Sequence, residues 1–463
     1  MHRMSNPIAF PLDQPELEFV ASGDALVRRS VLPSGVRILT ERVPGARSVT
    51  LGYWVAVGSR DEFPAESAHD GLSAHPASLG STHFLEHLLF KGTPSRTALD
   101  IAIAFDSVGG EHNAATAKEY TCYYAKIRDS DLPMAIEVMS DMLTSSLIDP
   151  DEFETERDVI LEELAMAEDD PSDVAQERFF EAVLGEHPLG RPIGGSPETI
   201  RAATREAVVA HYQANYRPND LVITAAGSLN HEDIVAQVQR TLETAGWDLN
   251  IEAAPVPRRD RTPVLITQGT ALQVIERPIE QANIMLGVPG IVATDERRVV
   301  QTVMNAILGG GMSSRLFQEI REKRGLAYSV FSFASSYSDA GAFGLFAGTS
   351  PKKAPEVAEL LLAEFHKLAQ HGVTADELTR AYGQLAGGSA LALEDTDTRM
   401  SRLGKAEISS GEFIDYDAAL TLLDAVTVER IQDLAQELAG GDLSLVSVGQ
   451  ADADALSRIL SRG

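Results

Sequence analysis

Residues 83–87 read His-Phe-Leu-Glu-His, and the rest of the chain is best interpreted outward from this stretch. In a helix, His83 and His87 are one turn apart on one face, so their ring nitrogens can reach a single metal ion about 2 Å away. Glu86 lies on the same face and can take a proton from water, the general-base role in metal-assisted hydrolysis. The opposite, apolar face consists of Phe84, Leu85, Leu88 and Leu89. The pattern predicts a helix that buries its apolar residues and presents a polar trio.

A third metal ligand is expected further along the chain, because a catalytic zinc site has three protein ligands and one open position. Residues 151–168 read as a helix rich in carboxylates. Its apolar stripe consists of Phe153, Ile160, Leu164 and Ala167. Glu156 and Glu163 lie two turns apart on the shoulder of this stripe, whereas Glu162 points to the far side. We therefore predict Glu163 as the third ligand, with Glu156 one layer further out.

These segments resemble the zinc peptidases of the pitrilysin and mitochondrial processing peptidase family, the inverzincins. The resemblance rests on residues 81–93, on residues 109–116 and on Glu-Arg-Asp-Val-Ile-Leu-Glu-Glu at 156–163, and it extends from about Leu32 to the C-terminus. It implies a zinc metalloendopeptidase with one Zn²⁺ per chain. The implied metal ligands are His83, His87 and Glu163, and the implied catalytic residues are Glu86 and Glu156.

The resemblance also implies residues that bind an extended peptide. Asn113 and Ala114 precede a predicted strand at 120–125, and in the family this edge pairs with the substrate backbone. In the second half, Arg321 and Tyr328 are similar to an Arg-x6-Tyr element that reaches toward the substrate or the developing oxyanion.

The order of predicted elements repeats along the chain, which indicates two similar halves. Residues 120–164 run strand, turn, helix, loop and helix, and residues 341–387 repeat this order. The proline-containing stretch 250–263 is the predicted linker. It joins a catalytic, zinc-binding half at 1–249 to a non-catalytic half at 264–463 that contributes to substrate binding. The predicted fold class is α/β (α+β), with helices packed on a largely antiparallel sheet in each half.

The charge balance is strongly acidic, with 39 Lys and Arg against 68 Asp and Glu and a net charge of −29. This disfavours binding to nucleic acid and to anionic membranes. Acidic residues around an interior cavity would favour basic, extended peptides; on the outside they would only aid solubility. Cys122 is the single cysteine and no apolar run is long enough to span a membrane, so we expect a cytoplasmic, bacterial protein.

Several alternatives stay open at this stage. The resemblance implies a clamshell homodimer, but one subunit of a heteromeric processing peptidase is a second reading and a non-catalytic, substrate-presenting scaffold is a third. Manganese or cobalt could take the place of zinc at an N/N/O ligand set. Residues 61–80 form a predicted loop that is longer than usual in the family, either a lid or a tolerated surface insertion.

Overall fold

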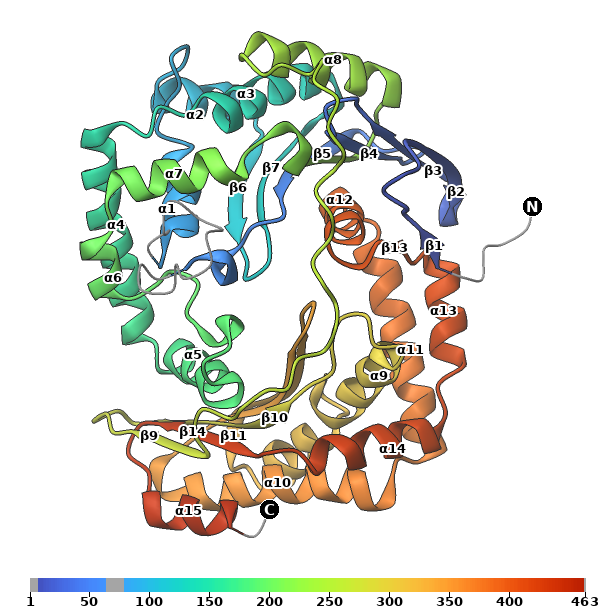
Figure 1. The fold of residues 1–463 in the computed structure, drawn as a ribbon. Helices are drawn as coiled ribbons and strands as arrows, with labels where there is room; N and C mark the ends of the chain where they lie inside the picture. The colour runs from blue at the N-terminus through green and yellow to red at the C-terminus, as the bar shows by residue number, and fades with distance from the viewer. Residues whose placement is uncertain (1–6, 64–78, 462–463) are drawn as a thin grey trace. The chain divides into compact units, whose positions relative to one another are not determined.

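The structure is a computed structural model that describes residues 7–63 and 79–461 (Figure 1). Its described residues form two compact units. Unit 1 contains Met1–Leu164, Pro192–Arg259 and Ala390–Ala418, and unit 2 contains Ala165–Arg191, Asp260–Ser389 and Ala419–Gly463. Compared with the predicted halves at 1–249 and 264–463, each unit has gained a segment from the other half of the sequence. Most of the predicted 61–80 loop lies outside the described residues.

Unit 1 is built on a seven-stranded sheet in which only the β4–β8 pair is parallel. In spatial order the strands are β2 (Glu16–Ala21), β3 (Ala25–Val31), β4 (Arg37–Arg42), β8 (Leu221–Gly227), β5 (Ser48–Val55), β7 (Thr121–Arg128) and β6 (Glu111–Thr116). Successive side chains alternate between two cores, as a sheet buried on both faces requires. Tyr53 belongs to the core on one face and Trp54 to the core on the other. A short pair, β1 (Ile8–Ala9) with β13 (Glu412–Phe413), lies apart from this sheet.

Helices cover both faces of this sheet (Figure 1). One face packs against α1 (Ser81–Leu88), α3 (Leu132–Ser145) and α8 (His231–Thr244). The other face packs against α12 (Thr396–Lys405), which comes from late in the sequence. The remaining helices that lie in or begin in unit 1 are α2 (Ala98–Asp106), α4 (Pro150–Asp169), α6 (Pro197–Ala202), α7 (Arg205–Asn215) and α13 (Tyr416–Asp424).

The fit of α12 on the sheet is close because glycines remove side-chain bulk on both sides. A Cβ at Gly404 would lie 2.3 Å from the Trp54 ring, and a Cβ at Gly52 would lie 2.4 Å from Met400 Sδ. The Thr50 and Thr396 hydroxyls are 2.8 Å apart in the same contact. Only glycine permits this approach of helix to sheet.

Unit 2 has a five-stranded sheet covered on both faces in the same way. In spatial order the strands are β11 (Ala327–Ser336), β12 (Gly341–Thr349), β10 (Ala282–Pro289), β14 (Ser444–Val448) and β9 (Leu272–Ile275). The helices on one face are α9 (Arg298–Gly309), α10 (Ala354–His371), α14 (Val428–Ala439) and α15 (Ala453–Leu460). The other face packs against α5 (Pro171–Leu184), which comes from early in the sequence, and α11 (Ala375–Ala392) follows α10.

The two sheets share one topology, which confirms the prediction of two similar halves with largely antiparallel sheets. The order β4-β8-β5-β7-β6 in unit 1 corresponds to β9-β14-β10-β12-β11 in unit 2. In both, the first pair is parallel and the other three pairs are antiparallel. The repeat predicted at 120–164 and 341–387 is β7-α3-α4 in unit 1 and β12-α10-α11 in unit 2.

The predicted linker at 250–263 contains neither helix nor strand, but its first part is fixed to unit 1. Arg258 donates to the carbonyl oxygens of Glu407 (2.6 Å) and Phe10 (2.7 Å). Arg259 donates to the carboxylate of Asp61, with Nη1 at 2.6 Å from Oδ1. The basic residues of this stretch therefore attach the chain to unit 1. Across residues 7–63 and 79–461, we find no helix with the length and apolar character that crossing a membrane requires.

Candidate metal centre

Helix α1 presents the polar trio as the sequence predicts. Phe84, Leu85 and Leu88 are fully buried under the sheet, whereas His83, Glu86 and His87 are half-buried on the other side of the helix. The helix spans eight residues and starts after Gly80, whose φ of +96° requires a glycine.

The structure brings His83, His87 and Glu163 together, with one ligand atom of each within 4.8 Å of the others. The Nε2 atoms of the two histidines are 3.3 Å apart, and Glu163 Oε2 lies 3.4 Å from His87 Nε2 and 3.7 Å from His83 Nε2. Three ligands on tetrahedral zinc with bonds of about 2.0–2.1 Å are separated by about 3.3–3.5 Å. The donor atoms are therefore of the types that zinc binds; two of the three separations fall in this range and the third, between His83 Nε2 and Glu163 Oε2, is slightly longer at 3.7 Å.

Helix α4 supplies the two predicted glutamates at different depths. Glu163, predicted on the shoulder of the apolar stripe, has its side chain 47% exposed. Glu156 is buried, with Oε2 2.9 Å from His87 Nδ1 and Oε1 2.5 Å from Lys91 Nζ. A metal-binding histidine commonly donates its second ring N–H to a carboxylate, which fixes the ring. Glu156 contacts His87 Nδ1 and not the ligand atoms, and the catalytic role predicted for it stays a prediction.

The second histidine is held differently. His83 Nδ1 is buried without a hydrogen-bond partner among the described residues. Its ring packs beside Gly194, where a Cβ would lie 3.5 Å from His83 Nδ1 and 3.1 Å from Leu164. Burial lowers the pKa of His83, and the neighbouring His87 lowers it further. A neutral imidazole, the form that binds a metal, is thus favoured.

Strand β6 orients the Glu86 side chain through a hydrogen bond. The backbone N–H of Thr116 donates to Glu86 Oε2 at 2.8 Å. Strand β6 is an edge of the sheet and pairs only with β7 among the described strands. It contains Asn113, which is exposed, and Ala114, which is buried. The predicted peptide-binding edge therefore lies beside the predicted general base.

A hollow of about 330 Å³ opens at the same edge. It is lined by Phe90, Lys91, Ala98, Ile101, Ala102, His112 and Asn113. Most of these side chains are apolar, and the His112 ring stacks on Phe105 with centroids 4.4 Å apart. Burial lowers the pKa of His112, which favours the neutral ring. The hollow has the lining expected of a site for one apolar side chain.

Arg321 and Tyr328 lie together in unit 2. The Arg321 guanidinium lies 4.4 Å from the centre of the Tyr328 ring and donates to the Tyr328 carbonyl oxygen at 2.9 Å. Tyr328 is 78% exposed, whereas its strand-like sequence alone indicates a core residue. Tyr328 is exposed because it lies at the start of β11, a strand at the edge of its sheet. The function predicted for this pair stays a prediction.

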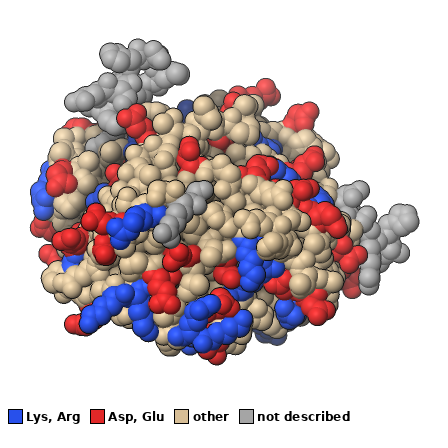
Figure 2. Space-filling model, turned by 90° about the horizontal axis from the view of Figure 1, so that it is seen from below, with Lys and Arg blue, Asp and Glu red and all other residues tan. Residues whose placement is uncertain are grey.

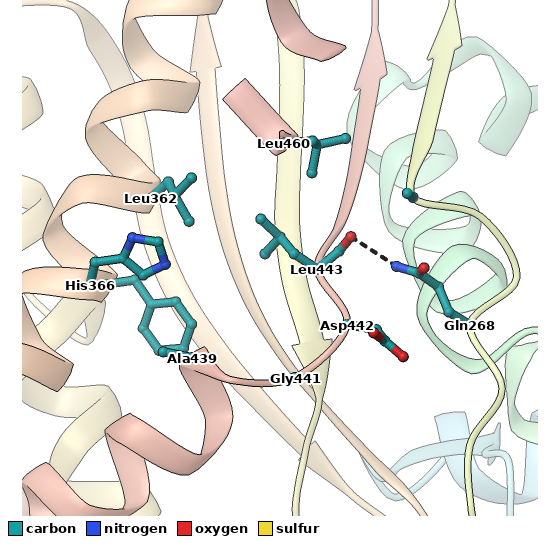
Figure 3. Close-up of a pocket in the computed structure, with 10 residues that line it drawn as sticks. Gln268, Leu362, His366, Ala439, Gly441, Asp442, Leu443 and Leu460 are labelled. Atoms are coloured by element: carbon teal, nitrogen blue, oxygen red, sulfur yellow. Dashed lines mark hydrogen bonds between the residues drawn. The ribbon is translucent and has the colours of Figure 1, made fainter. Parts of the chain in front are cut away.

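A second hollow, of about 290 Å³, lies in unit 2 between α10, α15 and the start of β14 (Figure 3). His366 and Asp442 are its titratable residues, and Leu362, Leu443 and Leu460 line it. Gln268 closes one side by donating to the Leu443 carbonyl oxygen at 2.8 Å. Among the described residues, the metal-ligand cluster found is the one in unit 1, so this hollow lacks the donor set of a metal centre.

Several residues that shape the site escaped the sequence prediction. Glu62 accepts hydrogen bonds from the start of α1, and His211 on α7 lies 3.1 Å from the Thr82 hydroxyl. Lys91 and Gly194 contact Glu156 and His83 as described above. None of these residues carries a periodic or spacing signal, because tertiary contacts alone bring them to the helix.

On one face of the molecule, charges of both signs are mixed (Figure 2). On the face shown in Figure 2, Asp and Glu side chains are scattered and Lys and Arg side chains lie among them. This face therefore presents mixed charge and not one uniform acidic patch.

Comparisons with known proteins agree with the geometry of this site. The family model described as "Insulinase (Peptidase family M16)" matches residues 37–196, and the model described as "Peptidase M16 inactive domain" matches residues 202–385. An uncharacterized zinc protease of Streptomyces coelicolor is 46% identical over 94% of this chain and 92% of its own length. An uncharacterized zinc protease of Bacillus subtilis is 36% identical over 91% of this chain and 98% of its own length.

Solved structures share the fold at lower identity. A protease from Helicobacter pylori superposes with a TM-score of 0.81 at 20% identity, covering 93% of this chain and all of that one. A structure from Pseudomonas fluorescens, described as a peptidase M16 inactive domain, gives 0.80 at 21% identity over 92% and 98%. The family models and the bacterial relatives at 46% and 36% identity show that the chain belongs to peptidase family M16, the insulinase family.

Proposed function

We propose that this protein is a zinc metalloendopeptidase that hydrolyses peptides or flexible protein segments. The observation that carries the proposal is the convergence of His83 Nε2, His87 Nε2 and Glu163 Oε2 at separations close to those of a tetrahedral zinc site. Glu86 lies on the same face of α1. The two relatives described above are named zinc proteases, and the match covers 92% and 98% of their lengths, which supports the same class.

The chain's own residues divide the chemistry between them. His83, His87 and Glu163 would hold the zinc, which would supply a Lewis acid and lower the pKa of water to about 7. Glu86 takes the proton of the attacking water and passes it to the leaving amine. The Thr116 N–H holds one Glu86 oxygen, so the other oxygen can point to the water. Glu156 keeps the His87 ring oriented.

The proposed substrate is an extended peptide. Among the described strands β6 pairs only with β7, so a peptide can add to its other edge as a further strand through main-chain hydrogen bonds, beside Asn113 and Ala114. The hollow beside Asn113 would take one apolar side chain. Main-chain pairing gives affinity with little selectivity, so the hollow would provide most of the sequence preference.

The finer parts of the proposal rest on the family resemblance. They are one Zn²⁺ per chain, a homodimer, and Arg321 and Tyr328 as contacts to substrate from the second half. The proposed cytoplasmic location rests instead on Cys122 as the single cysteine. A preference for basic peptides rests on the net charge of −29 alone. The division into a catalytic first half and a non-catalytic second half is part of the same proposal.

The test is cleavage of a quenched fluorescent peptide by wild type, Glu86→Gln and Glu162→Gln, with zinc content measured for each. Glu162 is exposed on the same helix as the proposed ligand Glu163 and serves as the matched control. We expect Glu86→Gln to keep its zinc and to lose about 10²–10⁴-fold in rate. We expect Glu162→Gln to match wild type.

Two results would contradict the proposal. Wild type that holds one zinc per chain and cleaves no peptide would favour a non-catalytic scaffold or a missing partner chain. Equal cleavage by Glu86→Gln and wild type would remove Glu86 from the mechanism.

A further inference from the structure

Helix α1 lacks a cap of its own. It spans only eight residues, and a helix this short is not stable alone in water. The first N–H groups of any helix have no partner within the helix and are usually satisfied by a side chain at the N-cap. The N-cap residue here is Gly80, which has no side chain. The element that carries both histidines and Glu86 must therefore be held at its start by a group from elsewhere.

Glu62 is that group. Its Oε2 accepts the Gly80 N–H at 2.7 Å, and its Oε1 accepts the Thr82 N–H at 2.7 Å. The side chain is 1% exposed. A carboxylate at the N-terminal end of a helix is also favoured by the helix dipole. One buried carboxylate, separated from α1 in sequence by the whole 64–78 stretch, thus holds two backbone groups immediately before His83.

Glu62 is itself fixed to the hairpin that ends the peptide-binding edge. It follows the short helix η2 (Ser59–Asp61), in which the Ser59 and Arg60 N–H groups donate to the carbonyl oxygens of Ala117 and Lys118 at 3.1 and 3.0 Å. Arg60 also pairs with Glu119 at 2.6 Å. Residues 117–119 form the turn between β6 and β7.

The same hairpin therefore controls both sides of the site. Through η2 and Glu62 it holds the start of α1, and through the Thr116 N–H it holds Glu86. The two connections together set the position of the histidines relative to β6. Ligand atoms must be held to within about 0.5 Å for a functional metal site.

We propose that Glu62 is a positioning residue for the metal centre, which fixes the start of α1 against the β6–β7 hairpin. This inference rests on the proposed zinc site. It makes Glu62 a determinant of zinc affinity although Glu62 contacts no ligand atom. Changes to groups that orient metal ligands commonly lower metal affinity by about 10–100-fold.

The first test compares Glu62→Gln with Asp415→Asn. Asp415 is a matched control because it is also a buried carboxylate that accepts from backbone: its oxygens accept the Ser22 N–H at 3.1 Å and the Ser22 hydroxyl at 2.6 Å, in a different turn. Zinc affinity is measured by competition with a chromophoric chelator. We expect Glu62→Gln to weaken zinc binding by at least about tenfold relative to Asp415→Asn. Equal zinc affinity in the two variants would overturn the proposal.

The second test needs no zinc, and its first part uses wild type alone. In zinc-free wild type, residue-resolved hydrogen exchange should show the Thr82 amide protected, although it lies in the first turn of α1 where amides usually exchange fast. In Glu62→Gln, or in Glu62→Asp if the first variant does not fold, the protection of Thr82 should fall at least tenfold while that of the β5–β7 pair is kept. A fast-exchanging Thr82 amide in wild type would overturn the proposal. If wild type binds no zinc, the proposed function fails, and the exchange result still decides whether Glu62 holds α1.

Discussion

The two ring nitrogens of His87 have separate tasks. Nε2 faces His83 and Glu163, and Nδ1 lies 2.9 Å from the buried Glu156. We expect Glu156→Gln to lower zinc affinity by about 10–100-fold, because the amide loses the charge that orients and polarises the ring. Chelator competition measures this, with Glu162→Gln on the same helix as control. Glu156→Gln with the zinc affinity of Glu162→Gln would show that the contact does not matter for the metal.

His211 gives a pH dependence at the level of one residue. Burial lowers the pKa of His211 to about 4, so the folded protein favours the neutral ring and the unfolded chain takes up the proton first. Its contribution to stability is complete above the unfolded pKa of about 6.5 and is lost as the pH falls toward 4. Between pH 7.5 and pH 4.5 we expect wild type to lose about 2–3 kcal/mol more of its free energy of unfolding than His211→Gln. Urea denaturation of the zinc-free proteins checks this, and equal losses would contradict it.

For single residues, the sequence predicts those whose place on a helix face follows from hydrophobic periodicity. The histidines, Glu86, Glu156 and Glu163 were found because helix geometry puts them on defined faces. Glu62 was not found, because a loop glutamate that the fold buries cannot be distinguished in the sequence from a surface glutamate. His211 was not found, because no periodic or spacing signal marks it. For Tyr328 the error is the opposite one: its strand-like sequence indicates a buried residue, but it begins an edge strand and is exposed.

Among the elements, α12 packs closely on its sheet. A Cβ at Gly404 would lie 2.3 Å from the Trp54 ring, which cannot shift easily because its Nε1 donates to Thr224 Oγ1 at 2.8 Å. We expect Gly404→Ala to lower stability by about 1–3 kcal/mol. Gly388→Ala is the matched control, because Gly388 lies in α11 with open space around it and should gain up to about 1 kcal/mol. Thermal unfolding of both variants measures the difference, and a tolerated Gly404→Ala would show that α12 adjusts.

The type and order of the elements were easier to predict than the unit in which each element packs. Helix α4, strand β7 and the repeat that includes α10 and α11 follow the predicted order. That α5 covers the sheet of unit 2 and α12 the sheet of unit 1 was not predicted. Hydrophobic periodicity marks an apolar helix face but does not say which sheet the face will cover.

For the whole molecule, the exchanged segments mean that the sequence cannot be divided at its apparent linker. A fragment of residues 1–263 lacks α12, so Trp54 and Val222 lose the helix that covers them. In a Trp247→Phe background, where Trp54 is the only tryptophan, we expect the fragment to show red-shifted emission and to bind a hydrophobic dye.

Adding residues 390–418 as a separate chain should reverse the red shift of Trp54. Dye binding is expected to fall only in part, because α5 still lacks the sheet of unit 2 that covers its apolar face. The control is the same segment with Leu403→Asp, because Leu403 is fully buried and a charge there cannot pack. If the fragment alone keeps Trp54 shielded, or if both segments act alike, the exchanged helix is not needed to complete unit 1.

Because α12 comes late in the sequence, the sheet that it covers is synthesised on the ribosome well before the helix. The strands of the seven-stranded sheet are complete once Gly227 has been made, but the end of α12 is Lys405, 178 residues later. At about 5–20 residues per second, one face of the finished sheet waits roughly 10 to 35 seconds for its cover. During that interval the nascent protein offers an apolar surface to the cell's chaperones, and a pause in translation before codon 405 would prolong the exposure.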